Sequence, residues 1–355
     1  MPEVILAHDY LLQVGGAERV VAEWAAGFGA RRVVTLAHAP ASTFDEFRDL
    51  DVRATIPGAF ANQVEWMLPA LPSIAARTTV DGGDVALVSS SGWAHRFQFE
   101  IPHVVYVHSP ARWLYAAEDY RMRLNPVRRA GLTLSTPLLK RGDLDAMHRA
   151  GAVVANSAVT QERIRLWYGI ESIVVHPPVE PVAPVAIEPD RELPAEFAVI
   201  VARDRGYKNV GLAVAAARIA GLPIVIAGSG SHALDEPESG VFGLGRISDP
   251  ELCWAYRHAA VVIGAGREDF GLTVIEAALE GTPAATIASG GYLETVSPGI
   301  NGFHAASETP EALAEAILLA RRLDADVCRA WGRAFGREAH VAQLATVIEE
   351  VVQGA

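Results

Sequence analysis

Residues 268–276 read Glu268-Asp269-Phe270-Gly271-Leu272-Thr273-Val274-Ile275-Glu276, so that seven residues separate two glutamates. The first glutamate precedes a glycine turn, and the second lies within the apolar run that follows. A helix that begins near Leu272 would place Glu276 about one turn into the helix and Glu268 on the loop before it. Both carboxylates could then face one crevice, together with the N–H groups of the helix start. The stretch predicts a site for a ligand that carries several hydroxyls and a diphosphate.

The composition bounds the class of protein. A chain of 355 residues is long for one domain and comfortable for two, and half of its residues are hydrophobic. The net charge of −12 disfavours a protein that generally coats nucleic acid. The chain has only two cysteines, Cys253 and Cys328, and their spacing is not typical of a metal site. This cysteine content favours a reducing compartment and no disulfide framework. The N-terminus does not read as a signal peptide, and no apolar run approaches the roughly 18 residues of a membrane span, so we expect a cytoplasmic protein.

Short apolar runs alternate with amphipathic stretches along the whole chain. Buried strands are expected at 4–7, 33–36, 85–88, 104–107, 153–155, 198–201, 224–227, 261–263 and 284–287. Helical patterns cover 17–28, 210–220, 250–259 and 273–280, and a closing helical pattern runs from about 310 to 352. This alternation predicts α/β layers with parallel sheets.

A proline-rich segment separates the two series of strands. Residues 176–184 read His176-Pro177-Pro178-Val179-Glu180-Pro181-Val182-Ala183-Pro184, and such a density of proline excludes helix and central strand. We therefore predict an N-terminal α/β domain over 1–178, a C-terminal one over 179–335, and a last helix over 336–355 that packs back on the N-terminal domain. Crevices outside the carboxyl ends of the strands would face each other across one cleft.

The Glu-x7-Glu stretch with its Phe-Gly-Leu core resembles the signature of retaining nucleotide-sugar glycosyltransferases of family 4. Other matching segments follow in the family's order: Gly15-Gly16-Ala17-Glu18-Arg19, His108-Ser109-Pro110-Ala111-Arg112, and Arg203 with Lys208-Asn209. The resemblance covers nearly the whole chain. It implies the GT-B fold, with two Rossmann-like domains facing a central cleft, the acceptor on the first and the donor on the second.

The resemblance also implies catalytic roles. His108 would lie near the donor sugar, and Arg203 and Lys208 would grip the diphosphate, where Arg suits bidentate contacts and Lys supplies a point charge. Glu268 would bind sugar hydroxyls and steady positive charge near the ring, with a covalent nucleophile as the minority alternative. No cofactor beyond the donor and no metal is expected, since the nearest Asp-x-Asp, at residues 324–326, falls in the C-terminal helical region.

The donor-binding positions include the two cations and a larger set of loop residues. Glu276 would accept hydrogen bonds from the ribose hydroxyls, and the others are Gly15, Gly16, Gly228, Arg246, Ile247, Phe270, Gly271, Leu272 and Thr273. Taken alone, each of these segments is compatible with a plainer role: strand-to-helix turns for the glycines, a core position for His108, and solvated surface charge for the cations. GDP-mannose is the first donor suggested, because the Gly-Gly-Ala-Glu-Arg and His-Ser-Pro-x-Arg pair resembles O-antigen-type mannosyltransferases.

A local positive charge marks the acceptor side. Residues 112–149 hold eight Lys or Arg against four acids inside an acidic chain, and Arg112, Arg128 and Arg129 are the acceptor-side candidates. The mixture of basic and apolar residues suits a lipid-linked acceptor or the anionic inner face of the plasma membrane, with solvated helix faces as the alternative. If the segment is an ordinary solvated face, a soluble acceptor glycan becomes the better expectation.

Three other functions stay open from the residues. A sugar-nucleotide epimerase of the same shape would turn over donor without acceptor. A nicotinamide-dependent dehydrogenase is disfavoured because G-x-G-x-x-G is absent. A catalytically silent nucleotide-binding partner subunit would bind the donor without hydrolysing it.

Overall fold

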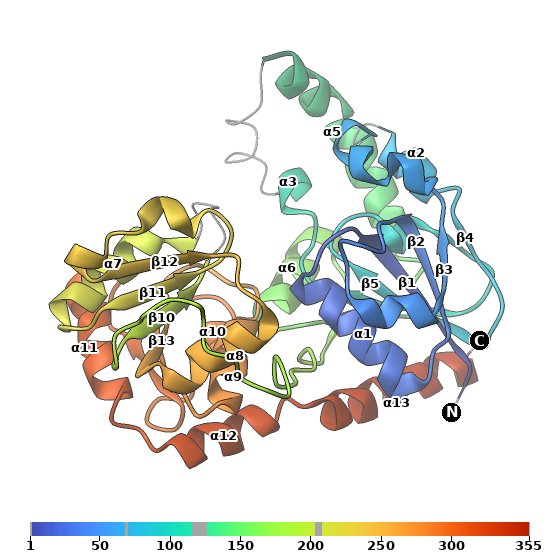
Figure 1. Ribbon diagram of the computed structural model, residues 1–355. Coiled ribbons are helices and arrows are strands. Elements are labelled where there is room, and N and C mark those ends of the chain that lie inside the picture. The colour runs from blue at the N-terminus through green and yellow to red at the C-terminus, as the bar shows by residue number, and fades with distance from the viewer. Residues whose placement is uncertain (1, 68–69, 116–125, 203–207, 355) are drawn as a thin grey trace. The chain divides into compact units, whose positions relative to one another are not determined.

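The computed structural model describes residues 2–67, 70–115, 126–202 and 208–354. Figure 1 shows two compact α/β units. The first unit comprises Met1–Pro178 and Arg337–Ala355, and the second comprises Val179–Gly336.

The first unit is built on a seven-stranded parallel sheet with the strand order β3-β2-β1-β5-β7-β8-β9. Its strands are β1 (Val4–Leu11), β2 (Arg32–His38), β3 (Asp51–Ala54), β5 (Val85–Ser90), β7 (His103–Val107), β8 (Ala152–Ala155) and β9 (Ile173–Val174). Strands β4 (Thr79–Val80) and β6 (Gln98–Phe99) form a separate small parallel sheet. Successive side chains of a strand point to opposite faces, so Val4 and Leu6 enter one apolar core and Ile5 and Ala7 the other.

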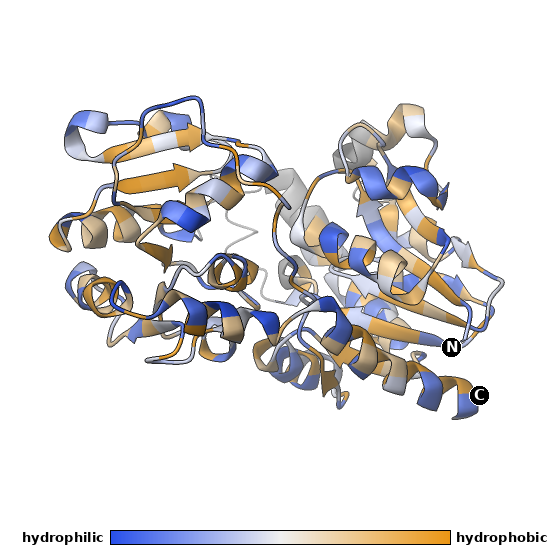
Figure 2. Ribbon diagram, turned by 60° about the horizontal axis from the view of Figure 1, so that its bottom comes forward, coloured by the Kyte–Doolittle hydropathy of each residue, from blue (hydrophilic) through white to orange (hydrophobic). Residues whose placement is uncertain are grey.

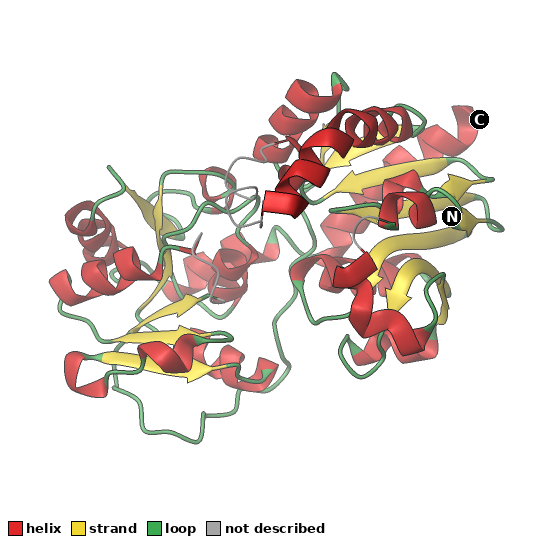
Figure 3. Ribbon diagram, turned by 90° about the horizontal axis from the view of Figure 1, so that it is seen from above, coloured by secondary structure: helices red, strands yellow, loops and turns green. Residues whose placement is uncertain are grey.

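Helices cover both faces of this sheet, as Figure 3 shows. The helices are α1 (Gly16–Phe28), α2 (Leu71–Ala75), α3 (Arg112–Tyr115), α5 (Pro126–Met147), α6 (Ala158–Tyr168) and α13 (Arg337–Gly354), with 3-10 turns η1 (Asp45–Asp49), η2 (Gly58–Met67) and η3 (Ala94–Arg96). Val20 and Trp24 of α1 share one core with Leu344 and Ile348 of α13.

The last helix is fixed to the first unit by a buried hydrogen-bond chain. The indole N–H of Trp24 donates to Nε2 of His340 at 2.7 Å, and the other ring nitrogen, Nδ1, donates to the carbonyl of His176 at 2.6 Å. Because Nε2 accepts, the tautomer with the proton on Nδ1 satisfies both bonds. Burial, mainly, lowers the pKa of His340 to about 4, which keeps the ring neutral at neutral pH.

The second unit has a six-stranded parallel sheet with the order β12-β11-β10-β13-β14-β15. Its strands are β10 (Ala198–Val201), β11 (Ile224–Ala227), β12 (Val241–Gly245), β13 (Val261–Gly264), β14 (Ala284–Ile287) and β15 (Gly302–Ala305). Its helices are α7 (Val210–Ile219), α8 (Asp249–His258), α9 (Leu272–Leu279), α10 (Tyr292–Thr295), α11 (Pro310–Ala320) and α12 (Ala325–Arg333), with 3-10 turns η5 (Ser231–Leu234) and η6 (Pro237–Ser239). Figure 2 shows the strands as largely hydrophobic ribbons, as expected for parallel strands covered on both faces.

The prediction of two α/β halves with parallel sheets is confirmed. The nine predicted strands are all present, and the four early helical patterns begin and end within one or two residues of the observed helices. The closing pattern from 310 to 352 is largely helical, as predicted. It consists of α11, α12 and α13, and the side chain of Asp324 accepts hydrogen bonds from two N–H groups at the start of α12.

Candidate functional site

In each unit, the order in which successive strands join the sheet reverses direction once. The reversal lies between β1 and β5 in the first sheet and between β10 and β13 in the second. Ligands of open α/β sheets bind outside the carboxyl ends of the strands at such a switch point. In the second unit, the predicted site residues follow the carboxyl ends of four adjacent strands: Arg246 and Ile247 after β12, Gly228 after β11, Lys208 beyond β10 and Glu268 beyond β13.

The central feature of this edge is an ion pair between Lys208 and Glu268. Lys208 Nζ lies 2.5 Å from Glu268 Oε1, and the two side chains are 17% and 19% exposed. Partial burial strengthens such a pair relative to one in open solvent. Asn209, the next residue, has a left-handed backbone (φ 48°) at the start of α7, a conformation that Asn tolerates better than most residues. Arg203, the second predicted cation, lies outside the described residues.

Two glycines fix the position of the loop that carries Glu268. The N–H of Gly291 donates to the carbonyl of Glu268 at 2.9 Å, and a Cβ on Gly291 would collide with the main chain of Phe270. Gly271 has a φ of 96°, and a Cβ there would come within 2.9 Å of the Tyr292 ring. Side chains at these positions would push the loop out of place.

The predicted residues around the start of α9 differ in what they present. The Phe270 ring is buried in an apolar cluster with Val179 and Ile275, so its main chain is the part that could approach a ligand. Leu272 and Thr273 form the first turn of α9 and are partly buried. N–H groups at a helix start are suited to bind phosphate oxygens.

Glu276 is positioned by a residue that the sequence patterns do not single out. The hydroxyl of Tyr256, on α8, donates to Glu276 Oε2 at 2.9 Å. Tyr256 itself is fully buried in the core of the second unit. A tyrosine on the buried face of a helix reads as a core residue, so no local signal announces this bond.

Two further strand ends of the same sheet are tied together. The N–H of Gly228 donates to the carbonyl of Gly245 at 2.7 Å. Gly228 (φ 138°) and Gly245 (φ 68°) both adopt conformations that favour glycine. Arg246 is exposed, whereas Ile247 packs partly on the core.

The first unit carries a chain of imidazoles at its own switch point. Nε2 of His108 lies 2.7 Å from the Ser89 hydroxyl, and Nδ1 of His8 lies 2.9 Å from the same oxygen. A hydroxyl can donate to one ring and accept from the other. Burial, followed by the charges of His8 and His340, lowers the pKa of His108 to about 3, so the ring is neutral at neutral pH. His108 was predicted from its motif, but the partners Ser89 and His8 were not.

A buried aspartate shapes the neighbouring loop. The carboxylate of Asp9 accepts hydrogen bonds from the N–H groups of Ser91, Trp93 and Ala94, at 2.6–2.7 Å. The loop after β5 is thereby fixed next to β1. Gly15 and Gly16 lie at the start of α1, where the buried Glu18 carboxylate folds over Gly15.

The acceptor-side candidates are placed only by their backbone. Arg112 begins α3, and Arg128 and Arg129 lie in the first turn of α5, but their side chains lie outside what the structure describes. Within the described residues, no group of three or more His, Cys, Asp or Glu side chains is arranged to hold a metal ion. Nor does any helix in the described part of the chain have the length and apolarity to cross a membrane. The arrangement defines an α/β protein with polar residues gathered at the ligand-binding edges of two parallel sheets.

Comparison with protein families gives two adjacent matches. The Glycosyltransferase Family 4 model matches residues 14–182, and the Glycosyl transferases group 1 model matches residues 186–334. A search of curated proteins found no match.

Solved structures of similar fold cover almost the whole chain. HepE of Anabaena, in complex with UDP and glucose, has 18% identity and a TM-score of 0.68, over 98% of this chain and 100% of its own. Sucrose-phosphate synthase of Thermosynechococcus elongatus has 20% identity and a TM-score of 0.69, over 99% and 100%. The lipopolysaccharide outer core galactosyltransferase WaaB, in its apo form, has 15% identity and a TM-score of 0.63, over 98% and 99%.

At these identities the structural likeness shows the fold alone. The two family models and the fold together identify a glycosyltransferase of the GT-B fold that is similar to family 4. The matching models are models of glycosyltransferases, enzymes that transfer a sugar.

Proposed function

We propose that the protein transfers a hexose from a nucleoside diphosphate sugar to an acceptor hydroxyl, with retention at the anomeric carbon. The observation that carries the proposal is the Lys208–Glu268 pair beside the switch point of the second sheet. In this pair, one cation and one carboxylate are in direct contact at the edge where an α/β sheet binds its ligand. A glycosyl donor needs both, because its diphosphate gains negative charge as its anomeric carbon gains positive charge.

Lys208 would stabilise the departing diphosphate together with Arg203 and the first N–H groups of α9. Electrostatic stabilisation of this kind strengthens as charge develops in the transition state. The glycosidic bond to the diphosphate breaks, and the diphosphate oxygen keeps the bonding electrons. Glu276, oriented by Tyr256, would accept hydrogen bonds from the ribose hydroxyls.

Glu268 would bind sugar hydroxyls and steady the positive charge near the ring. We favour attack by the acceptor hydroxyl on the same face that the diphosphate leaves, with a phosphate oxygen taking the acceptor's proton. The ion pair supports this choice over a covalent Glu268 intermediate, because a carboxylate neutralised by Lys208 is a weaker nucleophile. His108 would lie near the donor sugar as a neutral hydrogen-bonding ring.

The donor and the acceptor are finer parts of the proposal. GDP-mannose is the first donor to test, on the strength of the Gly-Gly-Ala-Glu-Arg and His-Ser-Pro-x-Arg motifs. UDP-glucose is the second, because HepE, a structural neighbour, was solved in complex with it. We propose a glycan or lipid-linked acceptor in cell-envelope synthesis, and a cytoplasmic protein that associates with the inner face of the plasma membrane.

A thermal-shift screen of GDP- and UDP-sugars tests the proposal. A true donor at 100 times its dissociation constant should stabilise the protein by about 2.7 kcal/mol. The configuration of the transferred sugar is then read by nuclear magnetic resonance on the product. Inversion at the anomeric carbon, or net turnover to an epimerised nucleotide sugar without acceptor, would contradict it.

A further inference from the structure

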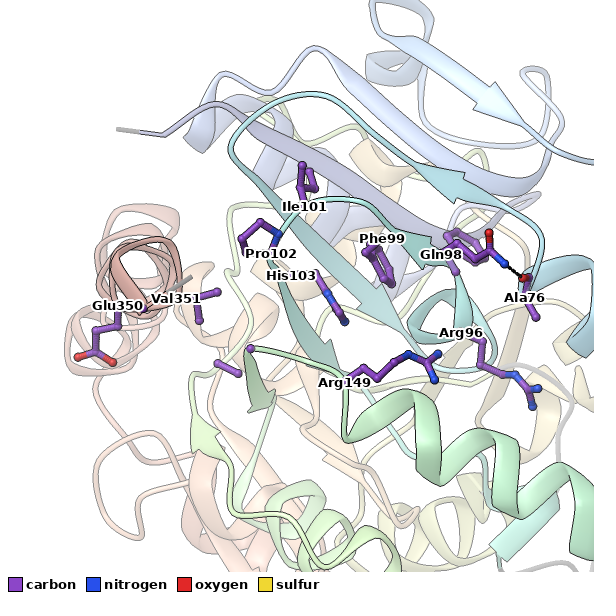
Figure 4. A pocket seen from close by; sticks show the side chains of 14 residues that line it. Ala76, Arg96, Gln98, Phe99, Ile101, Pro102, His103, Arg149, Glu350 and Val351 are labelled. Atoms are coloured by element: carbon purple, nitrogen blue, oxygen red, sulfur yellow. Dashed lines mark hydrogen bonds between the residues drawn. The ribbon is translucent and has the colours of Figure 1, made fainter.

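A cavity of about 1050 Å³ lies in the first unit, at the amino ends of β7 and β8. His103 begins β7 and Ala152 begins β8, whereas His108 follows the carboxyl end of β7. The cavity is therefore at the opposite edge of the sheet from the imidazole chain. Figure 4 shows that Arg96, His103 and Arg149 line it from different parts of the chain, and that Glu350 and Val351 of α13 close another side.

Two buried nitrogens of residues that line the cavity have no hydrogen-bond partner among the described residues. Nε2 of His103 and Nη1 of Arg96 are shielded from solvent and make no hydrogen bond. The His103 residue is only 7% exposed, and its ring stacks on Phe99 with 4.1 Å between ring centres. Buried polar atoms nearly always have a hydrogen-bond partner, so each unsatisfied one calls for an explanation.

The charges of the cavity favour an anion at the arginine end. Neither Arg96 nor Arg149 has a carboxylate within ion-pair distance in the described part of the chain. Asp143 and Asp145, on α5, lie near Arg96, but Asp143 already accepts bonds from His95 and Tyr115. Glu350 is the acidic group of the cavity wall, and it lies away from the two arginines (Figure 4).

His103 lines this end of the cavity, and Gly142 of α5 packs against Arg96. Burial, followed by the charges of Arg149 and His95, lowers the pKa of His103 to about 4, so the neutral ring offers one N–H. Gly142 lets the Arg96 guanidinium lie against α5, because a Cβ there would come within 2.7 Å of Nη2.

We propose that this cavity binds a phosphate group between the guanidinium groups of Arg96 and Arg149, with the imidazole of His103 as a further hydrogen-bond donor. Guanidinium forks match phosphate oxygens in geometry and charge. The group is a phosphomonoester, carried by a soluble molecule or by a lipid headgroup. The site is separate from Lys208 and Glu268, which belong to the second unit, and the proposal does not rest on the proposed function.

The site is tested by amide hydrogen exchange of the full chain, with and without inorganic phosphate. Chloride keeps the ionic strength of the two samples equal. We expect slower exchange at residues 149–152 and 350–354, and the same effect in the Lys208→Ala variant, which separates this site from the donor residues. Arg149→Ala should weaken phosphate binding there by about tenfold or more, since it removes a charged donor from an exposed position. Arg165→Ala, on α6, removes another exposed arginine, one that does not line the cavity, and should change nothing.

Two ligands distinguish the sources of the phosphate. Tighter binding of glucose 6-phosphate than of inorganic phosphate indicates a soluble phosphomonoester. Binding to phosphatidic acid vesicles that Arg149→Ala weakens and Arg149→Lys partly restores indicates a lipid headgroup. Phosphate that leaves exchange at 149–152 unchanged, or that protects it equally in folded Arg149→Ala protein, overturns the proposal.

Discussion

The hydroxyl of Tyr256 donates a hydrogen bond to the Glu276 carboxylate at 2.9 Å, and thereby joins α8 to α9 in the second unit. Tyr256 is fully buried, whereas Glu276 is only partly buried. The buried Tyr256 side chain cannot move easily, so its bond fixes the orientation of a carboxylate that is accessible at the ligand-binding edge. In the proposed function, this carboxylate accepts the ribose hydroxyls.

Tyr256→Phe should weaken donor binding while leaving kcat nearly unchanged. The loss of one hydrogen bond corresponds to about 0.5–1.5 kcal/mol, and Glu276→Ala should cost about 1–3 kcal/mol because the hydroxyls lose their acceptor. Calorimetry with the donor measures both. Tyr106→Phe is the control, since the Tyr106 hydroxyl donates to the carbonyl of Val175 in the first unit. Equal donor affinity in native, Tyr256→Phe and Glu276→Ala protein would remove Glu276 from the ribose site.

Gly291→Ala should lower transfer activity by displacing the loop of Glu268. The added methyl group would collide with the main chain of Phe270, so the loop must shift. Gly211→Ala, within α7, meets open space and should leave kcat/KM unchanged while raising stability by about 0.5–1 kcal/mol. Steady-state kinetics and thermal unfolding separate the two effects. A Gly291→Ala enzyme with native kcat/KM would show that the glycine does not hold the loop in its active position.

The stability of the first unit should fall as the pH drops from 7 to 5. His340 has a folded pKa of about 4 and an unfolded pKa near 6.5, so the unfolded state binds more protons between these values. Its contribution is present above the unfolded pKa and is lost as the pH falls through the folded one, about 2 kcal/mol between pH 7 and 5. His103 and His108 add in the same direction.

Urea unfolding at both pH values measures this loss, and His340→Gln is the informative variant. Glutamine can still accept a hydrogen bond from Trp24 and donate one to His176, but it does not titrate. The variant should therefore lose less unfolding free energy between pH 7 and 5 than the native protein. An identical pH dependence in both proteins would show that His340 does not contribute.

The exposed leucines of α5 should mediate binding to anionic membranes. Leu134 and Leu138, four residues apart, are 83% and 76% exposed, whereas Leu139 packs towards the core of the first unit. Lys140 is less available to bind anionic lipid, because its ammonium lies 4.9 Å from the centre of the Tyr115 ring. Replacing both exposed leucines by serine should reduce co-sedimentation with anionic liposomes, and Leu166→Ser, an exposed leucine of α6, should not. Liposome binding that the double variant leaves intact would make α5 an ordinary solvated helix.

Much of the fold was predictable because buried parallel strands are short apolar runs that need no partner to be recognised. In the two main sheets, strands β3, β9, β12 and β15 were not predicted. Strand β3 is mostly exposed at the sheet edge, and β12 contains Gly243 and Gly245. The break between α11 and α12 follows from the cap that Asp324 provides, in a sequence whose apolar pattern continues across it.

The sequence motifs single out Lys208, Glu268 and Glu276, and the structure places the first two in contact. The residues that support the site were not predictable, because their contacts join segments distant in sequence. Ser89 bridges His8 and His108, and Tyr256 reaches Glu276, without any spacing that marks the pairs in advance. Such contacts depend on tertiary packing and not on local pattern.

The rate at which the full chain releases nucleoside diphosphate from its sugar donor, in native and Lys208→Ala protein, tests the central claim most directly. If Lys208 stabilises the leaving diphosphate, its removal should lower kcat by about 100- to 1000-fold, or roughly 2.7–4 kcal/mol, and weaken donor binding far less. Circular dichroism would show that the variant is folded. A Lys208→Ala enzyme as fast as the native one, or a native protein that neither binds nor turns over any GDP- or UDP-sugar, would contradict the account.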